Sequence, residues 1–224
     1  MEEIKLIEVK EEILSDNIKQ AEEVRGRLEK TKTMLLNLMS SPGSGKTSLI
    51  LRTIEGLRGS LRLGVIEADI ESTVDAEKVS ARGIRAVQLR TGGFCHLDAA
   101  MVTRGIDAMN VSELDLVIVE NVGNLVCPAE FDTGAHKNVM ILSVPEGDDK
   151  PLKYPLMFSV CDLLLVNKID YLSLNDFDTA ALRKRTLALN PRITILEVSC
   201  KTGAGIGSWI DWLKAEVAAF KRLR

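Results

Sequence analysis

The chain has 224 residues, of which 46% are hydrophobic and 27% charged, a balance typical of a soluble globular protein. Its 29 basic and 32 acidic residues give a formal charge of -3, which excludes a strongly basic nucleic-acid-binding protein. No apolar run approaches the roughly 18 residues of a membrane span, and the N-terminus lacks the pattern of a signal peptide. Four cysteines without an export signal indicate a protein of the reducing cytoplasm.

The first predicted element is an amphipathic helix within residues 5–30. Its apolar side chains recur at roughly helical spacing, at Ile13, Ile18, Ala21, Val24 and Leu28. We expect this face to pack on the edge of the domain, with a partner-binding or dimer surface as the alternative. The chain therefore divides into an N-terminal amphipathic helical segment, residues 1–32, and one larger domain, residues 33–224.

From residue 34 onward, short apolar runs alternate with amphipathic stretches. The runs are often β-branched, and most are followed by Gly, Asn, Asp or Ser. This pattern is typical of an α/β fold, with a mostly parallel sheet of about seven strands and helices on both faces. The predicted strands are 34–39, 63–66, 86–89, 114–119, 139–144, 163–166 and 193–198, and the predicted helices are 45–58, 73–82, 97–109, 175–189 and 205–222. We interpret the polar stretch 145–151 as a surface loop.

The strongest local signal is Ser-Ser-Pro-Gly-Ser-Gly-Lys-Thr at residues 40–47, between a predicted strand and a predicted helix. It predicts a phosphate-binding loop, in which glycines let backbone amides curl around phosphate oxygens at a helix N-terminus. Lys46 is expected to bridge the β- and γ-phosphates, and the Thr47 hydroxyl to ligate Mg²⁺. The usual pattern begins with Gly, where this chain has Ser40. The nucleotide-binding residues predicted here are Pro42, Gly43, Ser44, Gly45, Lys46, Thr47 and Ser48.

The sequence Asn167-Lys168-Ile169-Asp170 follows a predicted buried strand and suits the recognition of guanine. The Asp170 carboxylate can accept from N1–H and the 2-amino group of guanine, a donor pair that adenine lacks. Lys168 can lay its methylene stem along the base, and Asn167 can tie this loop to the phosphate loop. After the next strand, Ser199-Cys200-Lys201 can present a backbone amide to the guanine oxygen.

Carboxylates predict the Mg²⁺ end of the same site. Glu120 ends one predicted strand and is followed by Asn121-Val122-Gly123, where ordinary GTPases have Asp in the pattern D-x-x-G. We expect Glu120 to hold Mg²⁺, directly or through water, and the Gly123 amide to sense the γ-phosphate. Asp69 and Asp75 follow another strand at the place of a first switch. One of them is expected to complete the Mg²⁺ shell and the other to orient the attacking water, without a choice between them.

A second metal site is predicted at Cys95, His96 and Cys127. Two thiolates and an imidazole are a soft ligand set that suits Zn²⁺ or Ni²⁺ rather than Mg²⁺. Cys127 follows Gly123 by four residues, so the metal can be coupled to the state of the γ-phosphate. Three ligands leave a tetrahedral site incomplete, and water, a substrate or a second subunit can supply the fourth. The remaining candidate ligands are interpreted as structural, namely Cys161, Cys200 and His136.

Four stretches together resemble the HypB family, the GTPases that assist nickel insertion into [NiFe] hydrogenase. The stretches are Ser-Ser-Pro-Gly-Ser-Gly-Lys-Thr, Thr-Gly-Gly-Phe-Cys-His-Leu-Asp, Glu-Asn-Val-Gly-Asn-Leu-Val-Cys-Pro and Asn-Lys-Ile-Asp. The resemblance implies a SIMIBI-type P-loop NTPase that binds GTP or GDP and hydrolyses GTP to GDP and phosphate. The first cysteine and histidine are Cys95 and His96, so the N-terminal Cys-rich site or His-rich tract of some members is not expected here.

The resemblance also implies a homodimer that depends on nucleotide or metal, with the Ni²⁺ or Zn²⁺ site of Cys95, His96 and Cys127 at its interface. Lys153 is then expected to reach the partner's nucleotide and act in catalysis. No arginine finger is evident in the sequence, and a lysine acting across a dimer would fill that role. The implied partners are the hydrogenase large subunit and a HypA-type nickel protein, with no nucleic acid and no membrane.

Three other functions stay open at this stage. A urease-type nickel GTPase is expected to have Cys-Pro-His at the metal loop, where this chain has Phe94-Cys95-His96. A metal carrier with a vestigial nucleotide site is disfavoured by the intact Lys46 and Thr47. An ATP-dependent partitioning or scaffold protein is disfavoured by Asp170.

Overall fold

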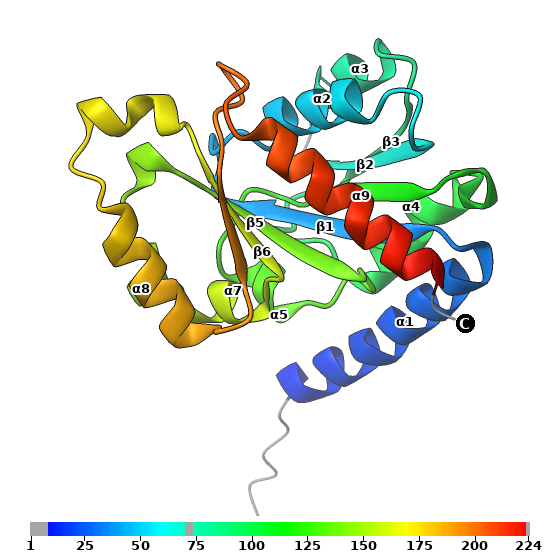
Figure 1. The fold of residues 1–224 in the computed structure, drawn as a ribbon. Helices are drawn as coiled ribbons and strands as arrows, with labels where there is room; N and C mark the ends of the chain where they lie inside the picture. Colours follow the sequence, from blue (N-terminus) through cyan, green and yellow to red (C-terminus); the bar gives the residue numbers. More distant parts are fainter. Residues whose placement is uncertain (1–8, 70–73, 223–224) are drawn as a thin grey trace, which may run out of the picture.

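The computed structural model describes residues 9–69 and 74–222, which form a seven-stranded parallel sheet with helices on both faces (Figure 1). The strands are β1 (Met34–Ser40), β2 (Leu63–Asp69), β3 (Arg85–Arg90), β4 (Leu116–Glu120), β5 (Lys137–Ser143), β6 (Leu163–Asn167) and β7 (Thr194–Glu197). They lie in the order β3-β2-β4-β1-β5-β6-β7, so β1 is the central strand. The predicted α/β fold is confirmed, and each predicted strand is found.

The helices cover the two faces of the sheet and explain why the central strands are apolar throughout. Every residue of β1 and β4 is buried, because side chains that alternate between two covered faces all meet a core. One face packs against α2 (Lys46–Leu57), α3 (Val74–Ser80) and α9 (Ile206–Arg222). The other face packs against α1 (Val9–Thr31), α4 (Ala99–Asp107), α7 (Pro155–Val160) and α8 (Thr179–Leu189).

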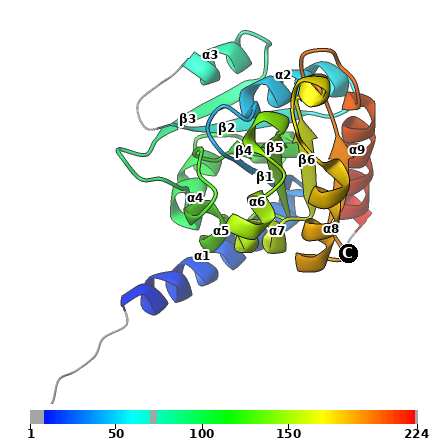
Figure 2. The same cartoon turned by 90° about the vertical axis from the view of Figure 1, so that its left-hand side faces the viewer.

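Helix α1 lies along the lower edge of the domain and extends beyond it at its N-terminal end (Figure 2). Ala21, Val24 and Leu28 are buried in the same core as α4, as the apolar pattern predicts. Ile18 was assigned to the same apolar face but is 51% exposed. The neighbouring Asn17 is buried instead, because its side chain accepts from the backbone N–H of Ala99 and donates to a backbone carbonyl near the end of α5 (Cys127–Glu130).

The stretch 145–151, predicted as a surface loop, contains more structure than expected. It overlaps the 3₁₀ helix η2 (Val144–Glu146) and the short helix α6 (Lys150–Lys153). Pro151 is buried under α8, so the stretch is held against the domain. Two further 3₁₀ helices, η1 (Val111–Glu113) and η3 (Ile169–Leu174), complete the description. In the part of the chain described, none of the helices combines the length and the apolar character that crossing a bilayer requires.

The topology places the carboxyl ends of the parallel strands along one edge of the sheet. The phosphate-binding loop follows β1, while Asp69, Glu120 and Asn167 are the last residues of β2, β4 and β6. In open parallel sheets, ligands bind outside this edge. The predicted nucleotide-binding residues are therefore brought together here by strand order rather than by sequence proximity.

Candidate functional site

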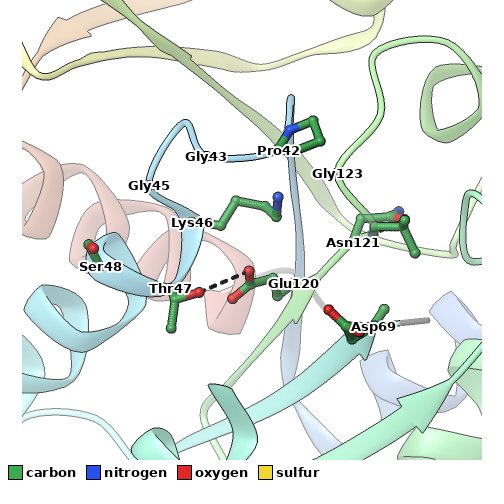
Figure 3. Close-up of a pocket in the computed structure, with 12 residues that line it drawn as sticks. Pro42, Gly43, Gly45, Lys46, Thr47, Ser48, Asp69, Glu120, Asn121 and Gly123 are labelled. Atoms are coloured by element: carbon green, nitrogen blue, oxygen red, sulfur yellow. Dashed lines mark hydrogen bonds between the residues drawn. The ribbon is translucent and has the colours of Figure 1, made fainter. Parts of the chain in front are cut away.

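A cavity of about 580 Å³ opens at the carboxyl edge of the sheet, over the loop between β1 and α2 (Figure 3). Nine residues predicted from the sequence line it, together with Ala68, Asn121 and Val122. The nine are Pro42, Gly43, Gly45, Lys46, Thr47, Ser48, Asp69, Glu120 and Gly123. The cavity therefore unites the phosphate-binding and Mg²⁺-binding residues that the sequence separates into three segments.

Two glycines allow the loop its shape. Gly43 has φ 75° and Gly45 has φ 108°, both in the left-handed region that side chains disfavour. A Cβ atom on Gly45 would also lie 2.5 Å from Nδ2 of Asn167, too close for any real contact. Gly45 is thus required both by its backbone conformation and by the loop that packs on it.

Ser40 stands where the usual phosphate-loop pattern has glycine, and the structure accommodates it in the core. Its side chain is fully buried, and its hydroxyl donates to the backbone carbonyl of Ser41. The Lys46 ammonium lies 3.1 Å from the same hydroxyl. The extra hydroxyl therefore adds a contact for the lysine, and the departure from the pattern leaves the loop intact.

Oxygen atoms suited to a hard cation gather at one end of the cavity. The Thr47 hydroxyl donates to Oε1 of Glu120 at 3.2 Å, and the exposed carboxylate of Asp69 lines the same cavity (Figure 3). A hydroxyl and two carboxylates match the oxygen ligands that Mg²⁺ prefers, so these residues fit that ion. Asp75 falls within α3, and its side chain lies outside what the structure describes.

The Asn167–Asp170 segment is joined to the phosphate loop by two hydrogen bonds. The side-chain amide of Asn167 donates to the carbonyl of Ser44 at 2.9 Å, as the sequence predicts. The Lys168 ammonium donates to the carbonyl of Gly43 at 2.8 Å, from a residue with φ 62°. Both segments of the predicted nucleotide site thus form one connected unit.

Asp170 is held by the segment that follows β7. Its Oδ1 accepts from the buried Ser199 hydroxyl at 2.6 Å, and its Oδ2 lies 3.9 Å from the Lys201 ammonium. Two of the three amides expected to face the guanine oxygen are used internally. The amide of Ser199 donates to Ala204, and that of Cys200 donates to Asn167 at 3.2 Å. This leaves the backbone amide of Lys201 as the better candidate to contact the guanine oxygen.

Glu146 is a part of the site that sequence reasoning missed. Its Oε2 accepts from the Ser44 hydroxyl at 2.7 Å and from the backbone N–H and hydroxyl of Ser143. The second carboxylate oxygen is buried without a protein hydrogen bond. Ser44 therefore faces Glu146 rather than the cavity. The available signal was the order Ser143-x-x-Glu146, a capping box inside the stretch interpreted as a loop.

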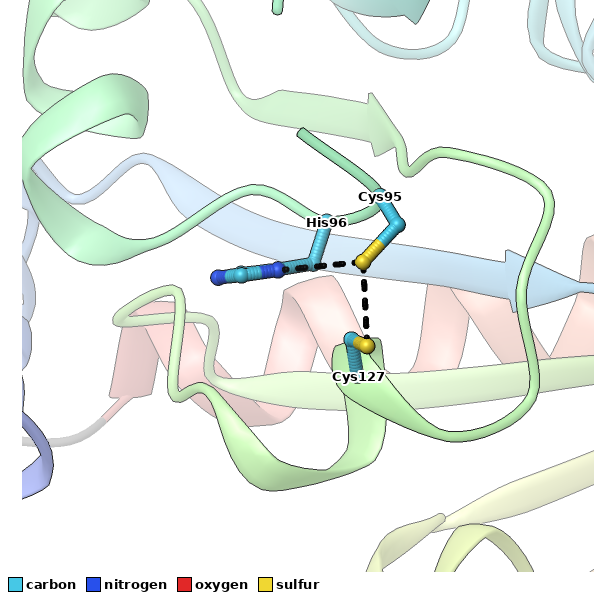
Figure 4. A group of neighbouring side chains, drawn as sticks. All are labelled: Cys95, His96 and Cys127. Atoms are coloured by element: carbon cyan, nitrogen blue, oxygen red, sulfur yellow. Dashed lines mark hydrogen bonds between the residues drawn. The ribbon is translucent and has the colours of Figure 1, made fainter. Parts of the chain in front are cut away.

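Cys95, His96 and Cys127 form the second cluster that the sequence predicts (Figure 4). Their ligand atoms all lie within 4.8 Å of one another. The Cys95 and Cys127 sulfur atoms are 3.0 Å apart, and the Cys95 sulfur is 3.8 Å from Nδ1 of His96. Both cysteines are free thiols. Two sulfurs and one imidazole nitrogen at this spacing can hold one soft or borderline metal ion.

The surroundings of the cluster favour the ligand form of His96 and disfavour the thiolate form of Cys127. The His96 ring stacks on Phe131 with centroids 3.9 Å apart, and burial lowers its pKa, which favours the neutral imidazole. The hydrogen bond that it shares with Cys95 and partial burial raise the pKa of Cys127. Proton loss from the thiols must therefore accompany metal binding.

The other candidates lie apart from both clusters. Lys153 is exposed on α6, where its ammonium pairs with Asp149 at 2.5 Å and does not line the cavity. That hydrogen bond raises the pKa of Lys153 and keeps the side chain cationic. His136 accepts from the backbone N–H of Leu35 at 2.9 Å, and Cys161 is buried under α7, so both act in the core, as predicted.

The chain is also similar in sequence to known proteins. The family model described as the CobW/HypB/UreG nucleotide-binding domain matches residues 34–197. A hydrogenase maturation factor HypB from Azotobacter chroococcum mcd 1 is 46% identical over 220 residues, which cover 98% of this chain and 72% of that protein.

Two solved structures are also similar. HypB from Helicobacter pylori in complex with nickel is 34% identical, with a TM-score of 0.87, and the match covers 91% of this chain and 96% of that one. HypB from Archaeoglobus fulgidus is 39% identical, with a TM-score of 0.85, and the match covers 91% of this chain and 99% of that one. The fold of this chain is that of these proteins.

Proposed function

This chain belongs to the HypB family of hydrogenase maturation factors, and from that premise we propose that it hydrolyses GTP to control a bound nickel ion destined for [NiFe] hydrogenase. The observation that carries the proposal is the pairing of two sites on one segment. Glu120 lies in the nucleotide cavity, and Cys127, seven residues later, lies in the Cys95–His96–Cys127 cluster.

The chain's own groups provide the hydrolytic chemistry. Lys46 neutralises charge on the β- and γ-phosphates, and the backbone amides of Gly43 and Gly45 surround the phosphate oxygens. Thr47, Glu120 and Asp69 are the residues that would hold Mg²⁺, which would stabilise the negative charge that develops on the phosphates. Asp75 remains our second candidate, beside Asp69, for orienting the attacking water.

Guanine recognition is assigned to the loops after β6 and β7. Asp170 has two carboxylate oxygens for the two donors of guanine, and Ser199 and Lys201 hold that carboxylate in place. Asn167 and Lys168 keep it at a fixed distance from the phosphate loop. This arrangement supports GTP over ATP, since adenine would leave the carboxylate unpaired.

Dimerisation is the third part of the proposal. Among the described residues that line the cavity there is no arginine, and Lys153 carries its charge on an exposed short helix outside its own cavity. A lysine in that position can complete the site of a second copy.

We assign residues 33–224 to the GTPase domain and 1–32 to an added helical segment. Surface thiols that must stay reduced to bind metal favour the cytoplasm.

Nickel is the cargo in this scheme, with Zn²⁺ as the competing ion for the same ligands. Its source would be a HypA-type nickel protein and its recipient the hydrogenase large subunit. A urease-type role is the second candidate, and the reading Phe94-Cys95-His96 at the metal loop disfavours it.

The experiment is a titration of the purified protein with Ni²⁺ and with Zn²⁺, with either GDP or a non-hydrolysable GTP analogue bound. Metal affinity should differ between the two nucleotide states by about 5–150-fold, an ordinary coupling. Affinity should fall on acidification, because the thiols must lose protons. Cys127→Ala should remove the dependence of metal affinity on the nucleotide state and leave GTP binding nearly intact. Cys161→Ala, which removes a thiol outside the cluster, should retain that dependence.

A GTPase assay tests the hydrolytic half separately. Lys46→Ala and Thr47→Ala should abolish turnover while circular dichroism shows a retained fold. Full turnover in either variant would contradict the assignment of the phosphate loop. Equal metal affinity in the two nucleotide states would contradict the coupling, even with the ligands correct.

A further inference from the structure

The side chain of Asn121 joins the nucleotide cavity to the loop that carries the first two metal ligands. Asn121 is completely buried and lines the cavity (Figure 3). Its Oδ1 accepts a hydrogen bond of 3.1 Å from the backbone N–H of Leu97 and one of 2.9 Å from that of Val122. Leu97 directly follows His96, so the side chain of Asn121 holds the backbone of the loop that carries Cys95 and His96.

The same residue is fixed to the central strand on its other side. Its backbone N–H donates to the carbonyl of Leu38, and its Nδ2 donates to Oδ1 of Asn37 at 3.0 Å. Asn37 in turn donates to Asn138 on β5 at 3.1 Å. A buried amide with both of its polar ends engaged is held in one orientation, because rotation would leave buried groups unpaired.

A short chain of contacts therefore runs between the two sites. Thr47 on the phosphate loop donates to Glu120, and Asn121 is the next residue along the chain. Asn121 binds the Leu97 amide. A displacement of the Asn121 side chain would be passed to the Leu97 backbone through this bond, and with it to His96.

We propose that Asn121 is the positioning residue that makes Cys95 and His96 respond to the state of the nucleotide. The inference rests on the proposed function, because it specifies how nucleotide and metal communicate. Cys127 follows the same segment through the main chain from Gly123 and through exposed contacts of Asn124, whereas Leu97 is held by a direct buried hydrogen bond. The two sulfur atoms, now 3.0 Å apart, change their spacing whenever these two connections move by different amounts.

The test compares metal affinity in two nucleotide states for four versions of the full chain. Ni²⁺ is titrated with GDP or a non-hydrolysable GTP analogue bound to wild type, Asn121→Ala, Asn121→Ser and Asn37→Ala. The ratio of the two affinities should fall to less than about twofold in both Asn121 variants, against about 5–150-fold in wild type. Asn121→Ser leaves a smaller void and covers the case in which the alanine variant does not fold.

Asn37→Ala is the matched control. It removes the acceptor of Asn121 Nδ2, but the backbone N–H groups of Leu97 and Val122 still fix Oδ1, so the variant should retain the wild-type ratio. Hydrogen exchange at the Leu97 amide adds a readout independent of metal. In the Asn121 variants, the exchange rate of the Leu97 amide should increase more than the exchange rates of the core-strand amides do. In Asn37→Ala, the exchange rate of the Leu97 amide should change only as much as those of the core strands.

The outcomes separate the two proposals. A wild type whose metal affinity is the same in both nucleotide states overturns the proposed coupling, and this inference with it. If wild type has a large affinity ratio and Asn121→Ala or Asn121→Ser retains it, the role of Asn121 is overturned and the proposed coupling stands. Loss of the ratio in Asn37→Ala as well would show a general effect of destabilisation and would also overturn it.

Discussion

The side-chain amide of Asn167 donates a 2.9 Å hydrogen bond to the backbone carbonyl of Ser44, which lies 123 residues earlier in the chain. This bond fixes the base-recognition loop to the phosphate loop before any nucleotide binds. The two loops then need little rearrangement to hold both ends of GTP, which lowers the entropic cost of binding. The close contact also leaves no room for a side chain at Gly45.

Gly45→Ala should therefore weaken GDP binding at least about tenfold. Its Cβ would meet the Asn167 amide at 2.5 Å and force the loops apart, in addition to a backbone cost of about 1–2 kcal/mol at φ 108°. Gly59→Ala is the control, because Gly59 has φ 76° but open space around it. Isothermal titration of both variants with GDP is the measurement, and equal affinities would show that the close approach has no role.

Asp170→Asn should lower GTP affinity about 100-fold, a loss of roughly 3 kcal/mol from two charge-assisted hydrogen bonds. The same variant should gain affinity for xanthosine triphosphate, whose ring has the reversed donor and acceptor pattern. Asp176→Asn, which changes an exposed carboxylate beyond the base loop, should leave both affinities unchanged. Unchanged GTP binding by Asp170→Asn would remove the guanine assignment.

Lys153→Ala should flatten the dependence of turnover on protein concentration. In wild type, hydrolysis per subunit should rise as dimers form, because a lysine from one copy would complete the site of the other. Lys150→Ala is the matched control from the same short helix, and its ammonium lies over the Tyr154 ring. A wild-type rate that stays constant across the dimerisation range would rule out a lysine acting between subunits.

Because of His136, the free energy of unfolding should decrease in mild acid. Burial lowers its pKa to about 4 from the ordinary value of 6.5, so the unfolded chain binds more protons between these pH values. The stability that the neutral ring provides is complete above pH 6.5 and is lost as pH falls through 4. Since the ring is partly exposed, we expect about 1–2 kcal/mol from it.

Urea unfolding at pH 4.5 and pH 7 checks this contribution. His136→Gln should lose less stability between the two pH values than wild type does. The carboxylates are common to both proteins, including Asp115, whose pKa is lowered by its hydrogen bonds to Arg62 and Lys221. The difference between the two proteins in the stability lost from pH 7 to pH 4.5 is therefore the contribution of His136. Identical losses in both proteins would contradict a lowered pKa for His136.

The local elements follow closely from the sequence. Apolar runs buried on both faces predict the seven strands, and the helical spacing of Ala21, Val24 and Leu28 predicts the packing of α1. Ile18 and the stretch 145–151 are the exceptions. Asn17 is buried at the expense of Ile18 because it finds two backbone partners from distant segments, which no local pattern records.

The motifs of the site were also visible in the sequence, because glycines at positive φ, a lysine and a hydroxyl must occur together to hold phosphate. Glu146 and Asn121 were not assigned roles there. Glu146 depends on Ser44, which lies 102 residues away, and Asn121 depends on Leu97, which lies 24 residues away. Hydrogen bonds of that kind depend on which strands lie side by side, and strand order leaves no trace in local periodicity.

The sequence by itself determined the fold class, and it predicted the phosphate loop, the guanine-recognition motif and three candidate metal ligands, because each prediction depends on residue types in short motifs. The tertiary structure alone decided that β4 lies beside β1. That neighbourhood sets Glu120 against Thr47 and Asn121 against Asn37. The physical reason is that coupling between two sites requires buried, directional contacts between distant segments, and only the packed sheet creates them.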